Sequence, residues 1–149
     1  MTERNRNFWI EVVLLVLIFA SIVVAIIASE LEPLNKDDIK LTTGDLRSFA
    51  AAGRQLVTQH QAGQLTETFF KTQVELLADK VSSSRKTLID SDAEPDAKQP
   101  QRAASDLAAQ IGAAIDQIQS SPHNESSAAQ QLSSLENKTK ELEERLKHE

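Results

Sequence analysis

The chain has 149 residues, no cysteine, an aromatic content of 4% and a formal net charge of -6, with 22 acidic against 16 basic side chains. The acidic balance argues against nucleic acid as a partner, because phosphate recognition needs a concentrated cationic face. The absence of cysteine excludes disulfides, thiolate nucleophiles and a lipidated cysteine anchor, and the few glycines and prolines favour long helices over a sheet.

An uninterrupted apolar run near the N-terminus is the strongest pattern in the sequence. The run carries no charge from Val12 to Ala28. Taken as residues 8–29, it makes about 33 Å of helix, which matches the hydrocarbon core of a bilayer, roughly 30 Å thick. We therefore predict a transmembrane helix over residues 8–29, preceded by a short cytoplasmic tail, residues 1–7. The alternative is a cleaved signal peptide, whose apolar region is normally shorter and ends in a small-x-small site.

Several side chains of this segment have candidate roles at the membrane. Phe8 and Trp9 lie where an interfacial aromatic belt is expected, and Glu11, one turn inside the boundary, is expected to extend to the headgroups. Small residues then recur at four-residue steps on one face, a spacing that lets a second transmembrane helix approach closely. These candidates for helix packing are Ser21, Ala25 and Ser29.

The charges on the two flanks of the apolar run predict its orientation. Arg4 and Arg6 lie close to its start, whereas the other flank begins with Glu30 and Glu32. Cationic flanks stay on the cytoplasmic side of a membrane. We therefore predict a cytoplasmic N-terminus and an extracytoplasmic C-terminal domain, either periplasmic or extracellular.

After a juxtamembrane linker, residues 30–41, apolar residues recur at three- and four-residue steps in four segments. This period predicts amphipathic helices rather than strands. Thr42 and Asp45 offer a capping box for the first helix, and Thr66 offers a cap for the second. The stretch from Asp90 to Gln101 contains two prolines and is expected to be an exposed connection. The predicted helices cover residues 43–60, 66–89, 101–119 and 122–147.

Four helices of this length with short connections favour antiparallel neighbours. The predicted fold class is all-α: a single N-terminal transmembrane helix followed by an antiparallel four-helix bundle or helical-hairpin domain over residues 42–149. This architecture resembles the periplasmic four-helix domains of bacterial receptors, although those chains re-enter the membrane and this sequence has no second apolar span. The stripes are narrow, closer to a coiled-coil seam than to a globular face, so we expect a marginal core that a partner stabilises. The seam of the fourth helix consists of Leu132, Leu135, Leu142 and Leu146.

The histidines offer one candidate metal site. If the helices alternate in direction, His60 and His123 lie at the same end of the bundle, near Glu67 and Glu125. Two imidazoles and two carboxylates are a ligand set that binds divalent metals. No metal-binding motif supports the site, however, and solvated loop histidines are the simpler expectation. We therefore predict no metal, no cofactor and, without a phosphate loop or a nucleophile motif, no catalytic residue.

The functional prediction is a non-catalytic, single-pass, membrane-anchored helical protein that acts as an accessory, assembly or scaffold subunit of a membrane protein complex. Its expected partners are the lipid bilayer and another membrane protein or a second copy of the chain, with no nucleic acid and no small-molecule substrate. The alternative is an extracytoplasmic four-helix sensor or ligand-binding domain, in which a ligand fills space between alanine-rich helices. A membrane-lysis or cell-division factor with a periplasmic coiled coil shares the topology, but interruptions by glycine and proline argue against one continuous rod.

Overall fold

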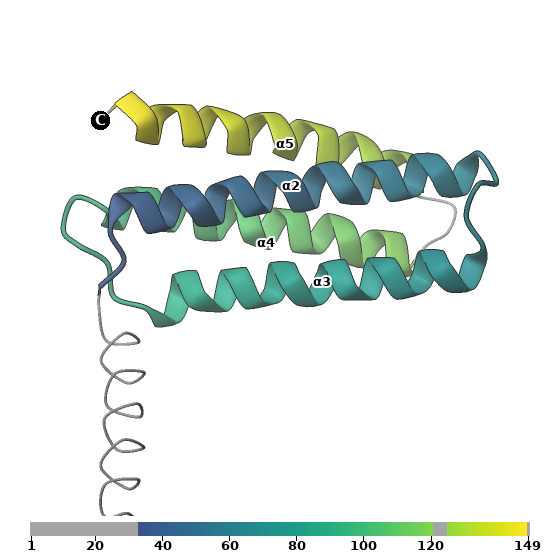
Figure 1. Ribbon diagram of the computed structural model, residues 1–149, viewed down its shortest axis with the longest axis horizontal. Helices are drawn as coiled ribbons and strands as arrows, with labels where there is room; N and C mark the ends of the chain where they lie inside the picture. The colour runs from purple at the N-terminus through teal and green to yellow at the C-terminus, as the bar shows by residue number, and fades with distance from the viewer. Residues whose placement is uncertain (1–32, 121–124, 149) are drawn as a thin grey trace, which may run out of the picture. The chain divides into compact units, whose positions relative to one another are not determined.

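The computed structural model describes residues 33–120 and 125–148. Four long helices run antiparallel to their neighbours, namely α2 (Lys36–Gln61), α3 (Glu67–Asp90), α4 (Lys98–Ser120) and α5 (Glu125–His148) (Figure 1). The chain divides into two compact units, residues 1–33 and residues 34–149, and the bundle is the second of them. Over the described residues, the prediction of an all-α four-helix bundle is confirmed.

The predicted membrane helix, residues 8–29, lies outside the described residues, as does the predicted cytoplasmic tail. Of the helices that the structure describes, none has the length and apolar character needed to cross a bilayer. The anchor therefore stays a prediction from the sequence. The same holds for the six residues singled out within it, Phe8, Trp9, Glu11, Ser21, Ala25 and Ser29.

Helix α2 begins at Lys36 rather than near residue 43, which corrects the second half of the predicted linker over residues 30–41. The Oδ1 atom of Asn35 accepts a hydrogen bond from the backbone N–H of Asp38 (3.0 Å), and the Asp38 carboxylate accepts one from the backbone N–H of Asn35 (3.1 Å). This reciprocal pair satisfies donors that the first turn leaves free, as in a capping box. Thr42 instead lies inside the helix, where its hydroxyl donates to the carbonyl of Asp38 (3.0 Å).

The other helices begin and end close to the predicted positions. Thr66 caps α3 as predicted, because its hydroxyl accepts a hydrogen bond from the backbone N–H of Phe69 (3.3 Å). Helix α4 begins at Lys98, a few residues early, and Pro100 falls in its first turn. A proline is tolerated there because the N–H groups of a first turn have no helical partner in any case.

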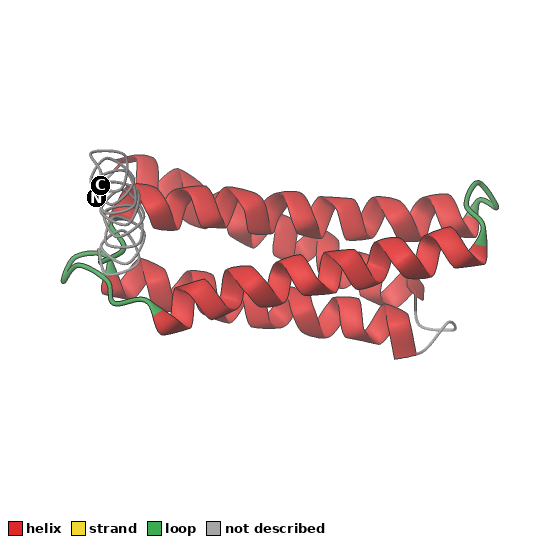
Figure 2. Ribbon diagram, turned by 60° about the horizontal axis from the view of Figure 1, so that its bottom comes forward, coloured by secondary structure: helices red, strands yellow, loops and turns green. Residues whose placement is uncertain are grey.

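The helices form a ring in which α2 and α4 each pack against both α3 and α5 (Figure 2). Helices α2 and α4 also pack across the bundle, whereas the backbones of α3 and α5, over their described residues, do not approach closely. Short side chains on the inner face of α4, Ala104, Ala108 and Ala114, leave room for this approach. The largest fully buried side chains of the core include Ile39, Leu46, Leu88, Ile111, Ile115 and Leu132.

One end of the bundle, called here the base, holds the start of α2 and the α3–α4 loop. The backbone N–H of Leu34 donates to the carbonyl of Asp92 (2.7 Å), and the carbonyl of Leu34 accepts from the N–H of Glu94 (3.1 Å). The side-chain amide of Gln101 donates to the carbonyls of Leu88 (2.8 Å) and Ser91 (2.7 Å) at the end of α3. The residue at which the chain enters the bundle is thereby fixed to the α3–α4 loop as well as to α2.

Candidate functional site

A histidine lies between two carboxylates at the opposite end of the bundle, called here the tip. The Nε2 atom of His60 is 3.0 Å from a carboxylate oxygen of Glu67, and its Nδ1 atom is 3.3 Å from one of Glu125. The imidazole also stacks on the ring of Phe70, with centroids 4.0 Å apart and planes 5° from parallel. His60 on α2 thus links the first turns of α3 and α5, two helices that do not pack on each other.

Both neighbours of the His60 ring are carboxylates. Carboxylates only accept hydrogen bonds, so the ring satisfies both neighbours at once only when both of its nitrogens carry protons. The ammonium of Lys71, which hydrogen-bonds Glu67 at 3.1 Å, holds the pKa of the Glu67 carboxyl below its ordinary value, and His60 adds to this effect. The contacts of His60 with Glu67 and Glu125 therefore link three helices, and we call this cluster the clasp.

The alternating helix directions place His60 beside Glu67 and Glu125 as expected, but these three side chains do not have the geometry of a metal site. The two carboxylates lie on opposite nitrogens of one ring, so no ring lone pair converges with them on a common point. Over residues 33–120 and 125–148, no group of three or more His, Asp or Glu side chains could hold a metal ion. The second histidine of the expected site, His123, lies outside the described residues.

A small cavity of about 160 Å³ opens beside the clasp, between α3, α4 and α5. Its volume is below the range of roughly 300–1,000 Å³ that is usual for small-molecule pockets. Three carboxylates against one ammonium give it an excess of negative charge. Its lining comprises the apolar side chains of Phe70, Val74 and Ile118 and the polar side chains of Glu67, Lys71, Glu75, Gln119 and Glu125.

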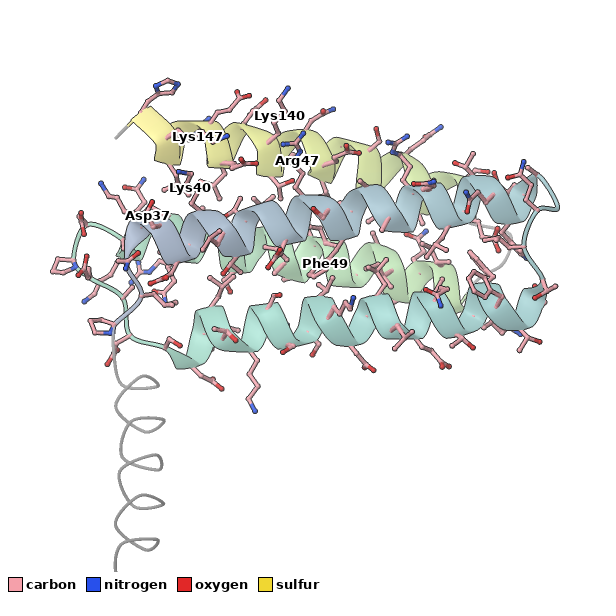
Figure 3. All side chains as sticks on the ribbon, in the orientation of Figure 1. Asp37, Lys40, Arg47, Phe49, Lys140 and Lys147 are labelled. Carbon is pink, nitrogen blue, oxygen red and sulfur yellow. The ribbon has the colours of Figure 1, made fainter. Side chains whose placement is uncertain are left out.

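A second hollow is an open groove of about 390 Å³ between α2 and α3. Phe49 and Leu56 from α2 are half-buried in it, and Leu76 from α3 is 50% exposed. Figure 3 shows Phe49 on the side of α2 that faces α3, away from Arg47. We call this hollow the α2/α3 groove; its remaining lining residues are Ser48, Ala52, Gln55, Gln59, Gln73, Leu77 and Lys80.

Exposed apolar side chains extend the α2/α3 groove at both ends. Leu41 is 71% exposed and precedes Ser48 by seven residues, and Phe69 is 49% exposed and precedes Leu76 by seven residues. Seven residues make about two helical turns, so each pair shares a helix face. Among the described residues, only Ile89 is a large exposed apolar side chain on a different face. Three of the four largest apolar exposures therefore gather on one side of the bundle.

The opposite side of α2, towards α5, is covered by ion pairs. Arg47 lies 3.3 Å from Glu143, and Arg54 lies 3.3 Å from Glu136. Lys147, at 2.8 Å, and to a lesser degree Arg47, hold the pKa of the Glu143 carboxyl below its ordinary value. Figure 3 shows Arg47 and Lys147 on this charged side. Its charges are satisfied within the chain, which distinguishes it from the α2/α3 groove.

The leucine seam predicted on the fourth helix lies inside the bundle. Leu132, Leu135 and Leu146 are no more than 8% exposed, and Leu142 is half-buried against the core. Helix α5 packs on α2 and α4, so this seam meets helices of the same chain.

Sequence reasoning did not single out the α2/α3 groove. The sequence of α2 does contain a signal for this groove. Phe49 and Leu56 form a second apolar stripe on the helix, beside the buried stripe that contains Leu46, Ala50 and Val57. The two stripes together are wider than one narrow seam.

Comparison with known proteins adds no relative. No protein-family model, no curated protein and no solved structure matches the chain. The function is therefore argued from the residues themselves.

Proposed function

We propose that this chain is a non-catalytic, single-pass, membrane-anchored helical protein that acts as an accessory, assembly or scaffold subunit of a membrane protein complex. The observation that carries the proposal is the α2/α3 groove, where Leu41, Phe69 and Leu76 stay exposed around half-buried Phe49 and Leu56. Monomeric soluble domains rarely gather large apolar side chains on one face, and such a patch usually marks a protein contact.

The membrane part of the proposal is supported by the sequence. The apolar run from Val12 to Ala28 ends shortly before Leu34, the first residue of the bundle. The cationic flank at Arg4 and Arg6 supports a cytoplasmic N-terminus, with the bundle on the extracytoplasmic side. A tethered bundle keeps its groove close to the membrane proteins that it would contact.

Fractionation of cells tests the anchor directly. The full chain should stay with membranes after an alkaline carbonate wash, and mass spectrometry should find residues 8–29 in the mature protein. A water-soluble product that starts after Ala28 would contradict the anchored subunit.

Site-specific photocrosslinking tests the contact surface. A photoreactive amino acid at Leu76 should give a discrete adduct with a membrane protein in intact membranes. The photoreactive amino acid placed at Ile89 is the matched control, because Ile89 is 57% exposed on α3 but lies outside the groove. No adduct from either position, together with a monomeric full chain in mild detergent, would refute a role in protein contact.

A second candidate function, an extracytoplasmic sensor, is favoured by the cavity at the tip. Carboxylates of Glu67, Glu75 and Glu125 around an apolar floor suit a small organic cation. The test is thermal unfolding of the protein with a panel of short alkylamines, since a ligand that binds the native state raises the midpoint. A midpoint that no amine raises, or that rises equally in a Glu75→Gln variant, would dismiss the sensor.

A further inference from the structure

We propose that the occupant of the α2/α3 groove is a second copy of this chain, docked in parallel about a twofold axis that runs along the bundle. The inference rests on the proposed function, because it assigns a partner to that contact surface. In this arrangement, α2 of one copy lies opposite α3 of the other, and the bases of both copies lie at the same end.

Heights along the bundle are set by the packing of α2 on α3. A Cβ atom built on Gly53 would lie 3.2 Å from the Cδ2 atom of Leu77, so these two residues are at the same level. Counting from this pair at 1.5 Å per residue, Asp45 on α2 and Lys80 on α3 differ in height by about 8 Å. Extended lysine and aspartate side chains together span such a separation.

The charges of the groove face are self-complementary in the parallel arrangement. Asp45 is exposed one turn from Phe49, Lys80 lines the groove, and neither joins an ion pair within the described residues. The twofold axis along the bundle brings Asp45 of each copy opposite Lys80 of the other, which makes two equivalent pairs. Opposite charges facing each other across an interface fix its register.

The antiparallel alternative lacks this complementarity. A twofold axis across the centre of the groove would place α2 against α2 with the heights inverted. Asp45 would then face the level of Gln59, and Lys80 the level of Gln73, so neither charge would gain a partner. The neutral glutamines of the groove tolerate both arrangements, and the charges select the parallel one.

The chain that precedes the bundle favours the same arrangement. The apolar run from Val12 to Ala28 leads into Leu34 at the base. A parallel dimer brings both copies of Leu34 to one end, which suits two chains anchored in one bilayer. An antiparallel dimer would send the two apolar runs to opposite ends.

The first experiment reverses the charge at Asp45 or Lys80 in the full chain. It then measures the mass of the protein in mild detergent and the dissociation constant of its dimer. Asp45→Lys alone and Lys80→Glu alone should each raise that constant by about 10-fold, because two symmetric pairs become repulsive. The double variant should restore dimerisation. Leu76→Ser should also weaken the dimer, whereas Ile89→Ser should not.

Single cysteines test the register, and the absence of native cysteine makes the result unambiguous. Ser48 on α2 and Ser83 on α3 share the groove face at about the same height, by the count of 1.5 Å per residue. A mixture of Ser48→Cys and Ser83→Cys chains should therefore form a mixed disulfide on oxidation. A dominant self-crosslink of an Ala52→Cys chain, without the mixed product, would overturn the parallel arrangement.

The outcomes separate this inference from the proposed function. A monomeric full chain that still gives the Leu76 adduct with a different membrane protein overturns the dimer and leaves the subunit role standing. A monomer that gives no adduct refutes both.

Discussion

The clasp at the tip makes a quantitative prediction for the His60→Gln variant. Glutamine keeps a polar side chain at the end of α2 but loses the second ring nitrogen and the stacked ring. The contact to Glu125 is desolvated, since that side chain is only 9% exposed. Hydrogen bonds to charged groups contribute about 1.5–3 kcal/mol in such settings, and an aromatic stack adds about 0.5–1.5 kcal/mol.

The expected loss of unfolding free energy is therefore about 2–4 kcal/mol, with no contribution counted for the exposed Glu67. For a domain of this size, each kcal/mol corresponds to about 4 °C in Tm, so the variant should melt about 8–16 °C below the parent.

The assay is thermal and urea unfolding of residues 34–149, followed by circular dichroism. A double-mutant cycle with Glu125→Gln isolates the coupling between the two side chains. His148→Gln is the matched control, because His148 is exposed at the end of α5. A loss no larger than that of the control would refute the clasp.

Three further changes test other parts of the bundle. Gly53→Leu should lower the free energy of unfolding in urea by about 1–3 kcal/mol, because even a Cβ atom there would lie 2.9 Å from the Leu132 side chain. Gly44→Leu is the control and should cost nothing, because a Cβ atom at Gly44 has nothing within 4 Å. Equal effects of the two changes would contradict the close approach at Gly53. Asn35→Ala should lose about 1 kcal/mol and some helicity by circular dichroism, and unchanged stability would rule out the capping box. Glu143→Gln should be less stable than the parent at neutral pH. Because the pKa of Glu143 is lowered in the folded protein, its contribution to stability is present above the ordinary pKa of 4.5 and is lost as the pH falls through the folded pKa. The unfolding free energies of the two proteins should therefore converge as the pH is lowered. A difference that stays constant with pH would contradict this.

The helices were predictable because their signals are local. Three- and four-residue apolar steps, and a hydroxyl before the first turn at Thr66, depend only on nearby residues. The start of α2 carries an equally local signal in the reciprocal pair of Asn35 and Asp38, but Thr42 and Asp45 offer a competing cap. The choice depends on the anchoring of Leu34 to the α3–α4 loop, which lies far away in sequence.

The sites were predictable only in part. Alternating helix directions are enough to bring His60 near Glu67 and Glu125, since all three lie at helix ends at the tip. Periodicity does not decide which of two neighbouring stripes on α2 faces the core. The choice depends on how closely α3 packs on α2. In the structure, Phe49 and Leu56 line the α2/α3 groove at the edge of the core.

The two backbone hydrogen bonds of Leu34 determine how a force applied at this residue would enter the bundle. Both the N–H and the carbonyl of this residue are held by the α3–α4 loop, and Lys36 adds a 3.5 Å ion pair with Asp96 of that loop. A pull on Leu34 would therefore be shared between two connections. Tension applied at this residue would be transmitted to α3 and α4 through their loop as well as to α2.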